Sequence, residues 1–254
     1  MERVHILGIP IDPVTMEEAV RRVQEMLQRS VQCHVMTPNS EMLVEAHRNP
    51  AFKEVLQKSM LNLPDSAGLL WAARRQGQRL PERVSGVDFV ERLCATLSAD
   101  VPVFLLGGRN GVAEKAAQKL RMDPTSLKLR GAGNGELRII GMYEGSPQEE
   151  DAQEIIHRVN ISAAKLLLVA YGAPVQDLWI AKHLSGMPNI RVAIGVGGTF
   201  DFLAGNIRRA PKWMRSLGLE WLWRLMLQPQ RIGRICMAII VFPFLVLTTK
   251  KHAS

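Results

Sequence analysis

An acidic residue, Asp65, stands between an apolar segment of the chain and an amphipathic one, in the stretch LNLPDSAG. A carboxylate at the end of a strand can accept the proton of a nucleophilic hydroxyl at the mouth of a crevice. The same residue can instead act as the N-cap of the helix that follows. The sequence alone leaves both interpretations open.

Two polar residues, Thr37 and Asn39, follow an earlier apolar segment in the tripeptide TPN. Asn is a common helix N-cap, and a residue before proline favours an extended or turn conformation. Both side chains can also hydrogen-bond a polar ligand. Each residue is therefore either a turn and cap residue or a binding residue.

Glycine-rich loops follow two further apolar segments. Gly107 and Gly108 begin the sequence GGRNG, and Gly197 and Gly198 lie in GVGGTFD. Backbone N–H groups of such a turn, next to a helix N-terminus, can bind phosphate. Neither loop is a Walker A or GxGxxG sequence, and a tight turn that needs positive φ is the simpler interpretation of each. Together they favour a phosphorylated ligand without identifying it.

The metal-binding residue types show no spacing typical of a metal site. The chain has no HExxH, CxxC or DxD sequence, and its six histidines and three cysteines are scattered. We therefore expect metal-independent chemistry and no cofactor. Isolated cysteines in apolar segments are usually small core residues, which indicates a reducing compartment.

Short apolar strands alternate with amphipathic helices between residues 31 and 194. With 254 residues, 47% of them hydrophobic, the chain is large enough to bury a substantial core. Alternating strands and helices predict an α/β, Rossmann-like fold: a mostly parallel sheet with helices on both faces. In such a sheet ligands bind beyond the carboxyl ends of the strands, where the polar and glycine loops would meet.

The predicted strands cover residues 33–36, 60–63, 103–106, 137–140, 166–171 and 191–194. The predicted helices cover 40–58, 66–76, 87–98, 111–121, 148–160 and 175–184, after an earlier helix that begins at a capping box, Thr15-x-x-Glu18. Residues 122–135 are expected to form a loop or a small insertion.

The positive charge of the protein lies in its last fifth. Residues 1–204 carry 23 basic and 23 acidic residues, whereas residues 205–254 carry 9 basic and 1 acidic residue. We therefore expect an α/β core over 1–204 that binds the ligand, followed by a basic, tryptophan-rich and apolar helical segment over 205–254. Proline and glycine are expected to divide this segment into short helices, at Pro211, Gly218, Pro229 and Pro243.

The C-terminal segment admits three interpretations. Arginines interleaved with tryptophans can bind RNA through phosphate contacts and stacking. The same residues beside the apolar run 235–247 are typical of a segment at a membrane interface. That run has 13 residues and contains Pro243, so we expect it to be too short to span a bilayer. The run favours a membrane over RNA, and packing against the core is the third interpretation.

Seven stretches, in order along the chain, share the pattern of one family. They are TPNSEMLVEAHRNPAFKEVL, LPDSAGLLWAARRQG, LPERVSGVDFVERL, VFLLGGRNGVAEKAA, LRIIGMYEG, YGAPVQDLWI and GVGGTFDFLAGNIRRAPKWMRSLGLEWLWRLMLQPQR. On these residues the chain resembles the WecG/TagA/CpsF family of bacterial glycosyltransferases over nearly its whole length.

The resemblance implies an inverting, metal-independent transferase. Its donor would be a UDP-sugar, typically of the N-acetylmannosamine type, and its acceptor a sugar linked to polyprenyl pyrophosphate, in the synthesis of a cell-surface polysaccharide or teichoic-acid-type polymer. It would work as a peripheral protein on the anionic, cytoplasmic face of the bacterial membrane and would bind no nucleic acid. The resemblance leaves open whether it forms a homo-oligomer. The alternative is a nucleotide-binding, membrane-associated regulatory protein that transfers nothing.

The resemblance also assigns roles to residues. It makes Asp65 the catalytic base and places Thr37, Asn39, Arg83 and Gln176 in the polar pocket. The glycines at 107, 108, 197 and 198 would hold the nucleotide diphosphate. The C-terminal segment would close over the site and reach the lipid pyrophosphate and the membrane through its arginines, Arg208, Arg209, Arg215, Arg224 and Arg231.

The chain departs from the family pattern in three places. Pro174-Val-Gln-Asp177 stands where Pro-Lys-Gln-Glu is usual, and Gln228-Pro-Gln-Arg231 stands where Glu-Pro-x-Arg is usual. The apolar run after Arg234 is also longer than expected. We expect the first departure to affect the choice of donor and the last to strengthen membrane attachment.

Overall fold

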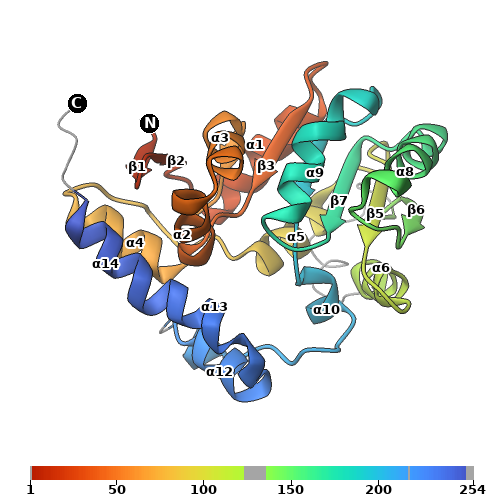
Figure 1. Cartoon of the computed structure of the whole chain (residues 1–254). Helices are drawn as coiled ribbons and strands as arrows, with labels where there is room; N and C mark the ends of the chain where they lie inside the picture. Colours follow the sequence, from red (N-terminus) through yellow and green to blue (C-terminus); the bar gives the residue numbers. More distant parts are fainter. Residues whose placement is uncertain (1, 123–135, 217, 250–254) are drawn as a thin grey trace.

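A six-stranded parallel sheet forms the centre of the molecule (Figure 1). The computed structural model describes residues 2–122, 136–216 and 218–249, so the loop predicted at 122–135 lies almost wholly outside the described residues. The strand order is β4-β3-β8-β7-β5-β6, which confirms the predicted fold class. The strands are β3 (Cys33–Met36), β4 (Leu61–Asn62), β5 (Val103–Gly107), β6 (Ile139–Tyr143), β7 (Leu166–Ala170) and β8 (Val192–Gly195).

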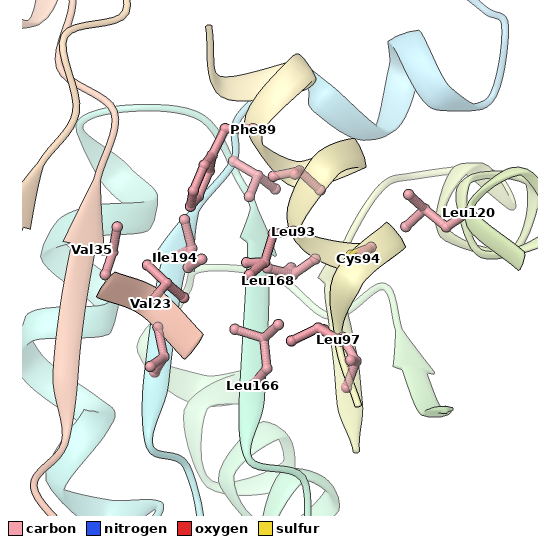
Figure 2. Packing of buried hydrophobic residues seen from close by; sticks show 14 of the residues in the cluster. Val23, Val35, Phe89, Leu93, Cys94, Leu97, Leu120, Leu166, Leu168 and Ile194 are labelled. Atoms are coloured by element: carbon pink, nitrogen blue, oxygen red, sulfur yellow. The ribbon is translucent and has the colours of Figure 1, made fainter. Parts of the chain in front are cut away.

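Alternate residues of the central strands face two hydrophobic clusters. In β7, Leu166 and Leu168 belong to the cluster drawn in Figure 2, together with Leu93. Leu167 and Val169 belong to the cluster on the opposite face. Because side chains alternate along a strand, a sheet covered on both faces needs apolar residues at every position.

Helices cover both faces of the sheet. The first cluster takes residues from α1 (Met16–Leu27), α5 (Gly86–Thr96), α6 (Val112–Met122) and α10 (Thr199–Leu203). The other takes residues from α8 (Glu149–Ser162) and α9 (Val175–His183). The predicted capping box is present at the start of α1: the Thr15 hydroxyl accepts from the Glu18 N–H, and the Glu18 carboxylate accepts from the Thr15 N–H.

A third cluster lies beside the sheet and contains two features that differ from the prediction. The single helix predicted over 40–58 is in fact two, α2 (Ser40–Arg48) and α3 (Pro50–Lys58), because Asn49 caps α3 with its side chain and Pro50 begins it. A short antiparallel hairpin, β1 (Val4–Ile6) with β2 (Ile9–Ile11), was not predicted. Both pack with α4 (Ala67–Arg75).

The C-terminal segment is helical, and its last part is one continuous helix rather than several. It contains α11 (Lys212–Ser216), α12 (Glu220–Leu227), η2 (Pro229–Arg231), α13 (Ile232–Cys236), the π-helical turn η3 (Met237–Val241) and α14 (Phe242–Thr248). The expectation that Pro243 would interrupt the helix is wrong. The wider π-helical turn just before it accommodates a residue that has no N–H to donate.

The continuous helix, Pro229–Thr248, packs one side on the core and exposes another. Ile235 and Phe242 are buried, and Phe242 belongs to the third cluster with α2 and α4. Ile240, Phe244 and Leu247 are exposed. The helix has 20 residues and is long and apolar enough to cross a membrane by length and composition alone, whereas the apolar run within it, 235–247, has 13 residues.

Gly195 at the end of β8 should not tolerate a side chain. A Cβ there would lie 2.3 Å from Oδ1 of Asp177 and 2.6 Å from Nε2 of Gln176. Because both side chains belong to α9 and are buried, we expect Gly195→Ala to cost about 1–3 kcal/mol of unfolding free energy, measured by urea denaturation.

Gly233→Ala is the matched control. Gly233 lies in α13 with no atom within 4 Å of an added Cβ, so the substitution should leave the unfolding free energy unchanged or raise it by up to about 1 kcal/mol. Equal stability of the two variants would contradict this description of the β8–α9 contact.

Candidate active site

A cavity of about 470 Å³ lies between the core and the C-terminal segment, at the end of β4. From the core it is lined by polar and charged residues that include Asn39, Asp65 and Arg83. From the C-terminal segment it is lined by Glu220 and three arginines, Arg224, Arg231 and Arg234. Residues more than 150 positions apart therefore form one pocket.

Asp65 is held in this cavity by backbone contacts and is not the cap of α4. The cap is Ser66, whose hydroxyl accepts from the Leu69 N–H at 3.3 Å. The N–H of Asp65 donates to the carbonyl of Pro38 at 3.0 Å, which ties the loop after β4 to the loop after β3. The carboxylate is thus left to face the cavity and α5.

Gly86, the first residue of α5, brings its backbone against two of the predicted site residues. Its N–H donates to the Asp65 carboxylate. A Cβ on Gly86 would lie 3.2 Å from Oδ2 of Asp65 and 3.3 Å from Oγ1 of Thr37. Asp65 and Thr37 therefore share one backbone neighbour, and a side chain at this position would crowd both of them.

The pKa of Asp65 is raised to about 7, chiefly because burial disfavours its charged form. The Gly86 N–H and the Arg83 guanidinium lower this pKa, whereas the carboxylates of Glu220 and Asp88 raise it. A carboxylate with a pKa near neutrality can both hold and accept a proton at physiological pH, as a general base requires. Asp65 therefore has the position and the acidity of a catalytic base.

Asn39 caps a helix and also lines the cavity. Its Oδ1 accepts from the Met42 N–H at 3.0 Å, at the N-terminus of α2, so the cap interpretation of Asn39 is confirmed. The two interpretations left open by the sequence are therefore compatible at this residue.

Gln176 is buried beneath the glycine loops and does not line the cavity. Its Oε1 accepts from the Gly172 N–H at 3.0 Å and from the Gly197 N–H at 2.9 Å. It thereby joins the loop after β7 to the loop after β8. The neighbouring Asp177, also buried, places its Oδ1 3.3 Å from Nε2 of His34 in β3. In this structure Gln176 positions the loops.

The loop after β5 lines a second cavity of about 590 Å³. Gly107 and Gly108 lie in it with φ of 95° and 82°, in the region that favours glycine. Arg109 and Lys115 line it too, as does Asp201 of α10, whereas the next residue of α10, Phe202, lines the first cavity. The two cavities therefore lie on either side of α10. Gly197 and Gly198 line neither.

A chain of ion pairs fastens the C-terminal segment to the core. Asp88 of α5 pairs with Arg209 at 3.0 Å and with Arg215 at 3.4 Å. Glu220 of α12 pairs with Arg209 at 3.3 Å and with Arg83 at 3.5 Å. Two of the five arginines expected at a pyrophosphate, Arg209 and Arg215, are therefore paired with a carboxylate of the core.

Three other arginines form a cluster on the cavity wall. The pKa of Arg231 is lowered to about 10, chiefly by burial and then by the neighbouring Arg224 and Arg234. The guanidinium of Arg224 lies 4.9 Å from the centre of the Phe202 ring, and its buried Nε has no hydrogen-bond partner among the described residues. Arg234 pairs with Glu41. Crowded guanidinium groups of this kind suit an anion with several oxygens.

Sequence reasoning did not single out Arg234, Glu220 or Gly86 as site residues. Arg234 follows Arg231 by three positions and so lies on the same side of a helix, a spacing that the sequence displays. Glu220 is the one acidic residue of 205–254. Gly86 gave no signal, because its role depends on how α5 meets the loop after β4. Arg208 is exposed and lies outside the cavity.

The part of the chain that the structure describes contains no group of three or more His, Cys, Asp or Glu residues placed to hold a metal ion. Guanidinium groups line both cavities and suit the charge of a bound phosphate group.

The chain matches the glycosyl transferase WecG/TagA/CpsF family over residues 4–254, and it belongs to that family. Glycosyl transfer needs a base for the attacking hydroxyl and stabilisation of the departing group. Asp65 with its raised pKa, and the arginines that line the two cavities, supply residue types for both.

Asp65→Asn should reduce glycosyl transfer about 10²–10⁴-fold, because the amide keeps the shape but cannot accept a proton. In the unchanged protein, kcat/KM should fall about tenfold per pH unit below about 7, since the protonated carboxyl is inactive as a base. Both are measured as transfer of the sugar to the acceptor.

Asp100→Asn is the control. Asp100 is exposed and lines neither cavity, so this variant should keep full activity. Near-normal turnover of the folded Asp65→Asn variant would contradict the assignment of the base.

Proposed function

We propose that the protein transfers a sugar of the N-acetylmannosamine type from a UDP-sugar to a sugar linked to polyprenyl pyrophosphate, with inversion and without a metal ion, in the synthesis of a bacterial cell-surface polymer. The observation that carries the proposal is that one cavity is lined both by Asp65 and by a cluster of three arginines. The first suits an attacking hydroxyl and the second suits a lipid pyrophosphate.

Inversion needs one in-line displacement at the anomeric carbon. In the proposed step Asp65 takes the proton of the acceptor hydroxyl, and the oxygen of that hydroxyl forms the new bond to the anomeric carbon. The bond from this carbon to the UDP oxygen breaks, and its electron pair leaves with UDP. Thr37 does not line the cavity but lies beside the same Gly86 as Asp65, and we propose that it helps to orient the sugar.

The donor nucleotide is proposed to occupy the second cavity, on the other side of α10. Glu144 and Asp201 also line this cavity, and the Glu144 carboxylate accepts from the Asn110 N–H. The glycine loop after β5 meets the N-terminus of α6 there, and Arg109 and Lys115 contribute cationic groups. These groups would offset the charge that develops on the UDP oxygens. Gln176 supports this arrangement from below by fixing the Gly197 loop ahead of α10.

The acceptor pyrophosphate is proposed to bind Arg224, Arg231 and Arg234. Arginine binds two phosphate oxygens at once, and the unpartnered Nε of Arg224 has a donor to offer. Arg209 and Arg215 instead hold the segment in place through Asp88, so they act on the pyrophosphate only through the position of this wall.

Membrane attachment is proposed to use the exposed side of helix Pro229–Thr248. Ile240, Phe244 and Leu247 form an apolar stripe on it at i, i+4 and i+7. The helix could cross a bilayer by length alone, but its buried Phe242 ties the opposite side to the core. This favours a helix that lies in the interface of the cytoplasmic face, and an apolar stripe gives no reason to expect RNA binding.

Metal independence has a direct test. Transfer should continue unchanged in excess EDTA, because guanidinium and backbone N–H groups would neutralise the diphosphate. The measurement is release of UDP from the UDP-sugar with a soluble acceptor. Loss of activity that Mg²⁺ or Mn²⁺ restores would show that a metal ion takes part. If the protein releases no UDP either in EDTA or with added metal ion, the regulatory alternative is favoured.

The exposed stripe should determine membrane binding. Ile240→Glu combined with Phe244→Glu should abolish flotation with vesicles that contain anionic phospholipid, since each buried CH₂ contributes about 0.8 kcal/mol. Transfer to a water-soluble acceptor should remain.

The matched control is Ile161→Glu, at an isoleucine of α8 that is 70% exposed. It should float as the unchanged protein does. A double variant that still floats would exclude this stripe as the attachment site.

A further inference from the structure

The helix wall of the first cavity changes character along its length. Residues 231, 234, 235, 238, 239 and 243 line the cavity from this helix, and their successive spacings of three, one, three, one and four keep them on one side. The first two are arginines, and the remaining four are Ile235, Ala238, Ile239 and Pro243. Over a rise of about 18 Å the wall turns from cationic to aliphatic.

Two tryptophans of other elements contribute apolar area to the cavity as well. Trp71 of α4 and Trp221 of α12 line the cavity, and Trp71 is 39% exposed although it is large and apolar. On the helix side Ile239 is 37% exposed. Exposed apolar side chains that face a cavity beside charged ones are typical of a site for an amphiphilic ligand.

We infer that the cavity has a subsite for the first isoprene units of a polyprenyl diphosphate, formed by Trp71, Ala238, Ile239 and Pro243, next to the arginines that take the diphosphate. The inference rests on the proposed function for the lipid nature of the acceptor, and adds where its hydrocarbon chain begins.

The spacing of the charged and aliphatic residues selects this ligand among lipids. Arg234 and Ala238 are four residues apart, a rise of about 6 Å. The ligand must therefore pass from anion to hydrocarbon within about one helical turn. In a prenyl diphosphate the carbon chain is bonded directly to the diphosphate, whereas in a phospholipid a glycerol ester separates the phosphate from two chains. Three crowded guanidinium groups also suit a diphosphate better than a single phosphodiester.

The subsite differs from the stripe proposed for membrane attachment. Ile239 lines the cavity, whereas its neighbour Ile240, which is 64% exposed, does not. Successive residues of a helix point about 100° apart, so the two isoleucines serve two surfaces. They form a matched pair for a test.

The test measures the affinity of the full-length protein for soluble diphosphates in the absence of membranes. Binding is monitored by tryptophan fluorescence or by calorimetry. Farnesyl diphosphate should bind at least about tenfold tighter than inorganic pyrophosphate, because burying even a few CH₂ groups supplies that factor. Ile239→Asn should bring farnesyl diphosphate to the level of pyrophosphate and leave pyrophosphate unchanged. Ile240→Asn should change neither.

Four outcomes would overturn the inference. They are equal affinity for the two diphosphates, an equal effect of the two asparagine substitutions, no effect of either, and equally tight binding of dihexanoyl phosphatidic acid with the same sensitivity to Ile239→Asn. Should Ile239→Asn not fold, Ala238→Trp, which fills the subsite from a partly exposed position, replaces it with the same expected result.

The two proposals can fail separately. Selective farnesyl diphosphate binding in a protein that transfers no sugar would leave the subsite standing and remove the proposed function. Transfer to a soluble acceptor by a protein that binds both diphosphates equally would do the reverse.

Discussion

The ion pairs between the core and the C-terminal segment are the interaction on which the site depends. Asp88 and Arg83 belong to the core, and Arg209, Arg215 and Glu220 belong to the segment. An exposed pair contributes only about 0–1 kcal/mol, but these groups are partly buried and share partners, so they act as a network. The same network covers Asp65, and two of its carboxylates help raise the pKa of that residue. The same charged groups therefore determine both the attachment of the segment and the pKa of Asp65.

The parallel sheet brings the remaining parts of the site together. Its strands end at one edge, so the loops after β3, β4, β7 and β8 become neighbours although they are far apart in sequence. Hydrogen bonds then fix their relative positions. Asp65 bonds the Pro38 carbonyl, and Gln176 bonds the N–H groups of two loops. A buried amide that satisfies two loop N–H groups restricts both loops to one arrangement, which preorganises the site.

Local signals in the sequence were enough for most of the sheet and for the position of Asp65. All six predicted strands exist because apolar runs bounded by turn residues are the pattern of a sheet buried on both faces. Contacts between distant segments were not visible. The π-helical turn before Pro243, the pairing of Asp88 with Arg209 and the place of Gly86 beside Asp65 each depend on how two elements meet. For the same reason Gln176 looked like a ligand-binding residue by its motif and lies beneath the loops instead.

The last helix has three different surfaces, so it connects the cavity with the proposed membrane contact. One side, with Phe242, packs on α2 and α4, a second, with Arg231 and Arg234, lines the cavity, and a third, with Phe244, is exposed. A soluble protein usually needs only the first of these, since a surface helix has one apolar side and one polar side. A helix that is apolar on two sides and cationic on the remaining one has a physical purpose where hydrocarbon and anionic groups are met together. An acceptor with a long hydrocarbon chain and a diphosphate presents that combination at a membrane surface. The wall of the active site and the proposed membrane contact are then parts of one rigid helix, so the depth at which this helix lies in the interface would set the height of Asp65 above it.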